Sequence, residues 1–310
     1  MDLILVFGGV VALYAGGEAL VRGAVRLAGV LGVRPLIIGL TVVAFGTSSP
    51  ELAASVTAAL TGAHEVVLGN VVGSNIMNIG LVLGLTALVY PLSARLTVVR
   101  REVPVMVAVG LLPLLVARDG VIGRLEGLIL VLLLAVYLLL LYRESRMPEE
   151  AAEFVEEYAP GGRGVLFALA AVAAGAVLLV VGARWLVEGG VNLARTVGVS
   201  ERVIGLTLVA FGTSLPELAS AMVAAVKQEA DIVLGNLIGS SIFNILAILG
   251  LTSMVRPVLT EYAVVVPDIL VMTAFGLLAL PMLHTRKRLD RWEGGVLAAG
   301  YLLYLVWLLG

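Results

Sequence analysis

The sequence predicts an all-α integral membrane protein with ten transmembrane helices, arranged as two inverted five-helix repeats. The first observation is composition, because 60% of the 310 residues are hydrophobic and only 14% are charged, whereas soluble domains carry about 25% charged residues. The second is a series of apolar runs that are long enough to cross a bilayer. The third is an internal repeat: residues 39–55 (GLTVVAFGTSSPELAAS) return at 205–221 (GLTLVAFGTSLPELASA) with 13 of 17 positions identical.

The spans follow from the length of the apolar runs. A helix crosses the hydrocarbon core with about 20 apolar residues, and ten runs of roughly this length can be placed along the chain. These runs lack the polar alternation that the strands of a membrane barrel require. The expected spans lie near residues 3–21, 36–60, 66–90, 103–117, 124–142, 164–187, 203–226, 232–254, 263–283 and 294–309.

The repeat divides these spans into five per copy. Because five is an odd number, the two copies must enter the membrane from opposite sides, as inverted repeats do. We expect a first five-helix repeat at 1–142 and a second at 164–310. The segment 143–163 between them is rich in glutamate and contains a Pro-Gly-Gly sequence, which is typical of a solvated, acidic cytoplasmic linker.

Loop charges predict the orientation. With the N-terminus outside, the cytoplasmic loops hold 14 Lys and Arg residues and the outer loops hold five, with Arg184 inside a span. The positive-inside rule therefore favours a multi-pass protein of the cell membrane with both termini outside. The inner set is Arg22, Arg26, Arg34, Arg95, Arg100, Arg101, Arg143, Arg146, Arg163, Lys227, Arg286, Lys287, Arg288 and Arg291; the outer set is Arg118, Arg124, Arg195, Arg202 and Arg256.

Composition also excludes several functions. The chain has no cysteine, so disulfides, thiolate metal sites and thiol redox chemistry are excluded. The net charge is −2, and no basic stripe indicates binding to nucleic acid. We expect no cofactor and no obligatory protein partner.

Each copy of the repeat places one carboxylate inside an apolar span. Glu51 and Glu217 occupy equivalent positions, and a charge at the bilayer centre costs about 2.5 to 3.5 kcal/mol on insertion scales. Two such residues related by an internal repeat predict a binding site at the interface between the repeats.

The residues before each glutamate supply further oxygen atoms. Pro50 and Pro216 remove a backbone donor and open the helix, which frees the carbonyls four residues earlier, at Gly46 and Gly212. A helical course brings the hydroxyls at the third and fourth positions before each glutamate onto its face. These hydroxyls are Thr47 and Ser48 in the first copy, and Thr213 and Ser214 in the second.

The following span of each copy carries a polar stripe. GNVVGSNIMN at 69–78 and GNLIGSSIFN at 235–244 place polar residues every fourth position. We expect Asn70 and Asn236 to hold neighbouring helices together, while the glycines at 69, 73, 235 and 239 permit close helix approach. The members expected to face the glutamates are Ser74, Asn78, Ser240 and Asn244. Carboxylate, hydroxyl and carbonyl oxygens are the ligands that Ca²⁺ prefers, whereas zinc and copper favour nitrogen and sulfur.

The paired motifs GTSSPE with GSNIMN, and GTSLPE with GSSIFN, resemble the two alpha repeats of the cation/calcium exchanger superfamily, and those of the prokaryotic sodium/calcium exchangers most of all. The first alpha motif covers 39–80 and the second 205–246. The resemblance implies the ten-helix sodium/calcium exchanger fold, with Na⁺ and Ca²⁺ as transported ions competing for adjacent sites.

The resemblance also implies a set of ligands. Glu51 and Glu217 would bind Ca²⁺ together with the carbonyls of Thr47 and Thr213, and Asn78 would border the central position with Asn244. An inner Na⁺ site would comprise the Ala44 carbonyl, Thr47, Ser48, Ser74 and Glu51. An outer Na⁺ site would comprise the Ala210 carbonyl, Thr213, Ser214, Ser240 and Glu217.

The expected function is a secondary active antiporter that exchanges Na⁺ for Ca²⁺ by alternating access, is electrogenic and needs no K⁺. Potassium-dependent relatives have Asp where this chain has Asn244, and proton-coupled relatives have Glu where it has Gly73 and Gly239. Potassium-dependent exchange, H⁺/Ca²⁺ antiport and a passive cation channel stay open as alternatives. An intramembrane protease is disfavoured because neither histidine lies at mid-membrane to act as a base, so we expect no enzyme.

Overall fold

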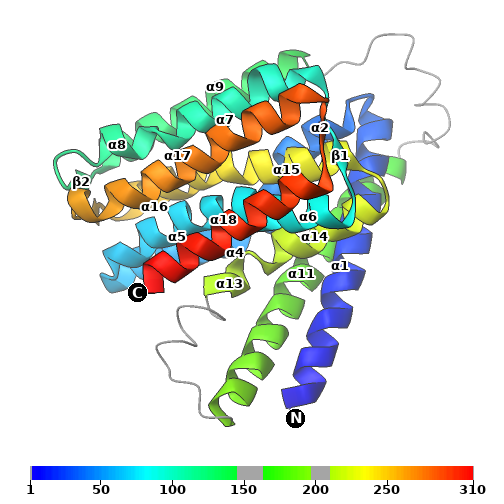
Figure 1. Cartoon of the computed structure of the whole chain (residues 1–310), viewed down its shortest axis with the longest axis horizontal. Helices are drawn as coiled ribbons and strands as arrows, with labels where there is room; N and C mark the ends of the chain where they lie inside the picture. The colour runs from blue at the N-terminus through cyan, green and yellow to red at the C-terminus, as the bar shows by residue number, and fades with distance from the viewer. Residues whose placement is uncertain (1, 145–162, 197–209, 310) are drawn as a thin grey trace.

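The computed structural model describes residues 2–144, 163–196 and 210–309. Most of the expected linker at 143–163 and the start of the second alpha motif, 205–209, lie outside the described residues. The described part is almost entirely helical (Figure 1), and the order of its elements along the chain gives ten successive helical passes. The expected ten-helix architecture is therefore confirmed.

The first half contains five passes, most of them built from more than one helix. The π-helices, labelled η, have a wider turn than α-helices. The elements are α1 (Asp2–Leu31); α2 (Pro35–Ile38), η1 (Gly39–Val43), α3 (Ala44–Thr47) and α4 (Ser49–Thr61); α5 (His64–Met77), η2 (Asn78–Val82) and α6 (Leu83–Val89); η3 (Val98–Glu102), α7 (Val103–Gly110) and α8 (Leu112–Val116); and α9 (Arg124–Glu144).

The second half repeats this order, as far as it is described. Its elements are α11 (Arg163–Thr196); α13 (Ala210–Thr213) and α14 (Leu215–Val226); α15 (Ala230–Phe243), η6 (Asn244–Leu249) and α16 (Gly250–Val255); α17 (Tyr262–Thr285); and α18 (Arg291–Leu309). Short strands β1 (Leu92–Ser93), β2 (Val121–Ile122), β3 (Val258–Leu259) and β4 (Arg288–Leu289) lie in the connections.

Fewer helices meet the length and apolarity criteria for a membrane span than there are helical passes. Among the described residues, six unbroken spans pass both criteria, and a seventh is added when the bent pair 35–47 and 49–61 is taken as one span. The first and sixth helices run about ten residues beyond the expected spans. Residues 22–31 stay helical because Val21, Ala24 and Leu27 are buried while Arg22 is exposed.

The contacts between loops agree with ten passes. β1 pairs with β4, which joins the connections after the third and ninth passes, and β2 pairs with β3, which joins those after the fourth and eighth. Because successive passes alternate in direction, odd-numbered connections must lie on one side of the membrane and even-numbered ones on the other. Both strand pairs obey this parity, and β1 and β2 are the repeat equivalents of β3 and β4.

The two longest helices, α1 and α11, lie side by side and run at a steep angle to the other long helices, such as α9 and α17 (Figure 1). Glycines recur every seventh residue on their shared face, at 9, 16 and 23 in α1 and at 175, 182 and 189 in α11. A Cβ atom on Gly9 would lie 2.8 Å from the Gly182 carbonyl oxygen, and one on Gly16 would lie 2.9 Å from that of Gly175. The glycines therefore allow backbone-to-backbone packing along the seam.

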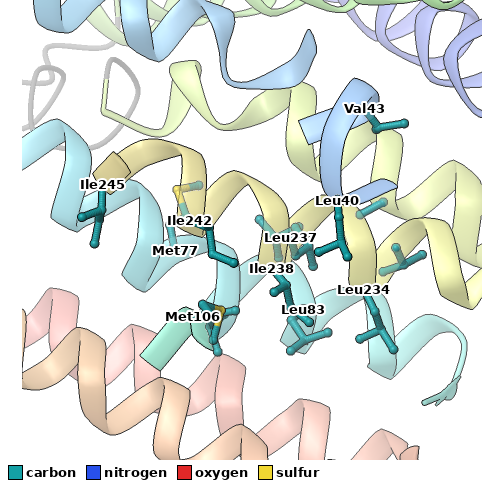
Figure 2. Close-up of a cluster of buried hydrophobic side chains, with 14 of the residues drawn as sticks. Leu40, Val43, Met77, Leu83, Met106, Leu234, Leu237, Ile238, Ile242 and Ile245 are labelled. Carbon is teal, nitrogen blue, oxygen red and sulfur yellow. The ribbon is translucent and has the colours of Figure 1, made fainter. Parts of the chain in front are cut away.

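The core is centred on α15. The most apolar stretch of the pass 230–255 is completely buried. Figure 2 shows Leu234, Leu237, Ile238 and Ile242 of this helix among side chains of the second, third and fourth passes. Gly235 lets the backbone of α2 and η1 approach closely, since an added Cβ would lie 2.7 Å from the Leu36 carbonyl oxygen and 3.0 Å from the Gly39 Cα. This packing holds α15 against the broken second pass, which carries Glu51.

Candidate cation-binding site

Both glutamates lie in the first turn after a break in a helix. α3 ends at Thr47, and α4 begins at Ser49 with Pro50 in its first turn, so that the axis bends by 44° between 35–47 and 49–61. Ser48 at the break has φ −84° and ψ 4°, and the equivalent Ser214 has φ −92° and ψ 6°. The expected proline-opened helices are therefore present in both copies.

The carbonyls around the first break are already partly engaged. The Ser49 hydroxyl donates to the Gly46 carbonyl at 2.8 Å, so the oxygen that proline frees does not depend on a cation for a partner. The Ala44 carbonyl accepts from the Ser48 amide at 3.0 Å, whereas the Ser214 amide donates to Phe211, at 3.2 Å. The two breaks are thus equivalent in shape but differ in hydrogen bonding.

The two repeats interlock through side chains of the candidate site. The Ser48 hydroxyl donates to Glu217 Oε1 at 3.1 Å, across the boundary between the repeats. The Thr47 hydroxyl donates to Asn236 Oδ1 at 3.1 Å and lies 3.5 Å from the Ser240 hydroxyl. Hydroxyls predicted to accompany Glu51 therefore reach the second-repeat residues, as a site shared by both copies requires.

Ten of the twelve predicted ligand residues are buried. Glu51, Glu217, Asn78, Asn244 and Ser214 are each 1% exposed. Of the remaining predicted positions, Ala44 (0%), Thr47 (0%) and Ser48 (3%) lie in and directly after α3, Ser74 (6%) lies in α5 and Ser240 (0%) lies in α15. Ala210 begins α13, and the partly exposed Thr213 ends it.

Several acceptor oxygens in this region have no hydrogen-bond partner among the described residues. They are both carboxylate oxygens of Glu51, Glu217 Oε2, and the side-chain carbonyl oxygens of Asn78 and Asn244; the Ser214 hydroxyl is also unpartnered. A buried polar atom without a partner costs about 1 to 3 kcal/mol, and more when it is charged. A cation satisfies such a set of oxygens at once, and the donor types are those of a hard cation.

Asn70 and Asn236 tie the glutamate-bearing helices to their neighbours. Asn70 Nδ2 donates to the Glu51 carbonyl at 3.1 Å and to the Ser55 hydroxyl at 2.9 Å. Asn236 Nδ2 donates to the Ser220 hydroxyl at 3.0 Å, which in turn donates to the Glu217 carbonyl at 3.0 Å. The expected role of these asparagines in holding helices together is confirmed, and Asn236 also accepts from Thr47.

Asn78 and Asn244 each begin a π-helix, η2 and η6. π-helical turns often occur at functional sites. Sequence periodicity did not predict these turns, because a π-helix inserts its extra residue without changing the apolar composition of the span.

Sequence reasoning missed Asn75. Its Nδ2 donates to the Ser241 carbonyl at 3.0 Å, and its Oδ1 accepts from Asn244 Nδ2 at 2.9 Å. Asn75 lies inside the GSNIMN motif, and its repeat equivalent Ser241 is also polar, which was the available signal. Glu102 was missed as well: it is buried in η3 and accepts from the Tyr137 hydroxyl of α9 at 2.9 Å.

Comparisons with known proteins show the family of the chain. The family model described as "Sodium/calcium exchanger protein" matches residues 1–143 and 167–310. The putative antiporter CaxA of Alkalimonas amylolytica is 38% identical, over 97% of this chain and 96% of its own. The sodium/calcium exchanger MaX1 of Methanosarcina acetivorans is 33% identical, over 99% and 98%.

A solved structure shows the same fold. The sodium–calcium exchanger NCX_Mj, soaked with zero Na⁺ and Ca²⁺, superposes with a TM-score of 0.86 at 31% identity, covering 99% of this chain and 98% of its own. Both halves of the chain match the family model, and the two repeats meet at the hydrogen bond from Ser48 to Glu217. The chain therefore belongs to the sodium/calcium exchanger family of multi-pass membrane antiporters.

Proposed function

We propose that this protein exchanges Na⁺ for Ca²⁺ across the cell membrane, at one site that both repeats build. The observation that carries the proposal is the set of buried oxygens of Glu51, Glu217, Asn78 and Asn244 that have no hydrogen-bond partner among the described residues. Two carboxylates present a charge of about −2 when ionised, which one Ca²⁺ neutralises and which several Na⁺ ions neutralise when they share the same oxygens.

Charge balance accounts for the coupling of the two fluxes. With no cation, two ionised carboxylates are left uncompensated in a region that excludes water, and buried unpaired charges cost several kcal/mol each. The unloaded protein therefore resists switching between its two orientations. Only the Ca²⁺-loaded and Na⁺-loaded forms switch readily between the two orientations, so the protein exchanges one ion for the other.

The proposed ligands divide between the two glutamates. Glu51, with the Ala44 carbonyl, Thr47, Ser48 and Ser74, forms the inner Na⁺ site. The outer Na⁺ site consists of Glu217 with the Ala210 carbonyl, Thr213, Ser214 and Ser240. Ca²⁺ takes both glutamates with the carbonyls of Thr47 and Thr213. The hydrogen bond from Ser48 to Glu217 Oε1 supports an arrangement in which the two halves share side chains.

The helix pair α1 and α11 is the proposed mobile unit. The backbones of the two helices touch along the glycine seam, so we expect them to move as one body against α15 and its neighbours, as alternating access in repeat transporters requires. A 30-residue and a 34-residue helix are about 45 and 51 Å long at 1.5 Å per residue. Because this exceeds the roughly 30 Å hydrocarbon core, the pair must tilt within the bilayer or extend beyond the core.

The proposed exchange is electrogenic and independent of K⁺, with both termini outside. If more than two Na⁺ move per Ca²⁺, each net charge is driven by about 2.3 kcal/mol per 100 mV. Asn244 is neutral, so two carboxylates rather than three face the proposed ions, which supports a site without K⁺.

The test is uptake of radiolabelled Ca²⁺ into proteoliposomes loaded with Na⁺ and diluted into choline, K⁺ or acidified buffer, with valinomycin to set the voltage. We expect uptake that requires internal Na⁺, increases when the interior is made positive, and proceeds in choline without K⁺. Uptake driven by protons or dependent on K⁺ would assign one of the other couplings instead. Ca²⁺ entry without any counter-ion gradient would indicate a channel.

The site assignment has its own control. Glu51→Gln and Glu217→Gln each remove one negative charge with little change in volume, so we expect each to abolish Na⁺-dependent Ca²⁺ uptake. Glu65→Gln, in the first turn of α5 near a membrane edge, removes a carboxylate outside the cluster and should retain uptake. Near-normal flux in either site variant would refute the site.

A further inference from the structure

Asn75 of α5 connects the first repeat to the second through its side chain. Its side chain is 3% exposed, and both ends of its amide are used. The nitrogen donates to the backbone carbonyl of Ser241 at 3.0 Å, and the oxygen accepts from Asn244 Nδ2 at 2.9 Å. The three residues form a relay that runs from the backbone of α15 to the first residue of η6.

The relay leaves only one orientation for each amide. A backbone carbonyl accepts hydrogen bonds and cannot donate them, so Asn75 must turn its NH₂ group toward Ser241 and its oxygen toward Asn244. Asn244 must then present its own NH₂ group to Asn75. The side-chain oxygen of Asn244 consequently faces away from Asn75, where it is buried and has no partner among the described residues.

The orientation of this amide matters because its two ends have opposite partial charges. The carbonyl oxygen attracts a cation, whereas the NH₂ group repels it. η6 packs against α4, the helix of Glu51. We propose that Asn75 is a positioning residue that holds the Asn244 amide with its oxygen, rather than its nitrogen, toward the transported cations. The inference rests on the proposed function, since it takes the buried oxygen cluster as the cation site.

In the described part of the chain, such a relay is present on one side of the site only. The repeat equivalent of Asn75 is Ser241, and its hydroxyl donates to the Leu237 carbonyl of its own helix at 2.9 Å. Among the described residues, no bond from Asn78 to Ser241 mirrors the bond from Asn244 to Asn75. The two equivalent asparagines are therefore held differently.

The experiment measures Na⁺-driven Ca²⁺ uptake by the full chain in proteoliposomes as a function of Ca²⁺ concentration. Asn75→Leu keeps nearly the same volume without hydrogen bonds, and Asn75→Ser introduces the residue of the second copy. For both we expect the half-saturating Ca²⁺ concentration to rise about tenfold, the equivalent of one well-placed hydrogen bond. We expect the maximal rate to stay within about twofold.

Thr273→Val is the matched control. Thr273 lines the same small cavity as Asn75, of about 20 Å³, but its hydroxyl donates within its own helix to the Ile269 carbonyl at 2.7 Å. The change is nearly isosteric and leaves the relay intact, so we expect wild-type Ca²⁺ dependence. The Ca²⁺-induced rise in melting temperature of the detergent-solubilised variants gives a second measure of affinity that does not depend on transport.

A double variant separates positioning from general loss of structure. If Asn75 acts through Asn244, adding Asn75→Leu to Asn244→Ala should change the half-saturating concentration no further, because the oxygen that Asn75 positions is gone. The inference would be overturned if the two substitutions raised the half-saturating Ca²⁺ concentration by factors that multiply in the double variant. It would also be overturned if both Asn75 variants had the wild-type half-saturating concentration. Loss of uptake in Glu217→Gln combined with unchanged Asn75 variants overturns the relay alone, whereas uptake that survives in Glu217→Gln overturns the proposed cation site on which the relay depends.

Discussion

At the scale of single residues, Ser48 contributes a contact that the neighbouring serine cannot replace. The Ser48 hydroxyl donates to Glu217 Oε1 in the other repeat, whereas the Ser49 hydroxyl donates to the Gly46 carbonyl in its own segment. We expect Ser48→Ala to raise the half-saturating concentration of Na⁺ or Ca²⁺ about five- to tenfold, since a hydrogen bond to a charged group contributes about 1.5 to 3 kcal/mol, part of which a bound cation replaces.

Ser49→Ala is the control for this prediction. It removes a hydroxyl one position away and leaves the contact between the repeats in place, so we expect ion dependence within about twofold of wild type. Concentration curves for Na⁺-driven Ca²⁺ uptake compare the two variants. Equal curves would mean that the hydroxyl of Ser48 does not act on the bound ions.

At the scale of helices, the seam between α1 and α11 depends on glycine. A Cβ on Gly9 would lie 2.7 Å from the Leu186 backbone nitrogen, while one on Gly8 would meet the Trp185 ring at an ordinary 3.6 Å. We expect Gly9→Ala to destabilise the protein by about 1 to 3 kcal/mol through overpacking. Gly8→Ala should be neutral or stabilising by up to about 1 kcal/mol, because alanine is the better helix former.

Thermal unfolding in detergent checks this pair of variants. We expect a lower melting temperature for Gly9→Ala and an unchanged or higher one for Gly8→Ala. The two glycines are adjacent in one helix, so helix propensity is matched and only the packing differs. A similar melting temperature for both variants would show that the seam tolerates an extra methyl group.

An ion pair connects the proposed mobile unit to the body. Glu18 of α1 lies 2.9 Å from Lys227 Nζ, which follows α14, and also pairs with Arg22 in its own helix. Partly exposed pairs contribute up to about 1 kcal/mol, enough to change the ratio of two conformations about fivefold. If α1 moves relative to α14, loss of this pair should depopulate the conformation in which it forms.

Spin labels at Tyr14→Cys and Val226→Cys, both exposed positions, report the distance between the two helices, and the absence of native cysteine makes the labelling specific. In Lys227→Gln, we expect the conformation whose label-to-label distance matches this structure to be less populated by up to about fivefold. Arg22→Gln removes a partner that does not bridge the helices and should leave the distribution unchanged. Identical distributions in all three proteins would exclude a role of the pair in switching.

At the scale of the whole molecule, the alternation of the loops predicts which positions a reagent can reach from each side. Arg118 lies in the connection that carries β2, and Arg288 lies in β4, on the opposite side by parity; both are exposed. With both termini outside, a membrane-impermeant maleimide should label Arg118→Cys in intact cells and label Arg288→Cys only after permeabilisation. The reverse pattern would invert the orientation that the loop charges favour.

The sequence by itself determined the passes, the internal repeat and the positions of both glutamates. Each of these features depends on residues that are close together in the sequence. The length of an apolar run determines whether it can span the bilayer, a proline removes a backbone hydrogen-bond donor, and residues three or four positions apart share one face of a helix. The glycine period of α1 and α11 could also be read in this way, although the partner of each glycine could not.

Only the tertiary structure decided which oxygens lack a partner and which side chains cross between the repeats. Ser48 and Glu217 are 169 residues apart, as are Asn75 and Asn244, so no periodicity within one span relates them. The π-helical turns at Asn78 and Asn244 were likewise visible only in the structure. Whether a buried polar atom is satisfied depends on everything packed around it, and that is fixed only when both halves of the chain have come together.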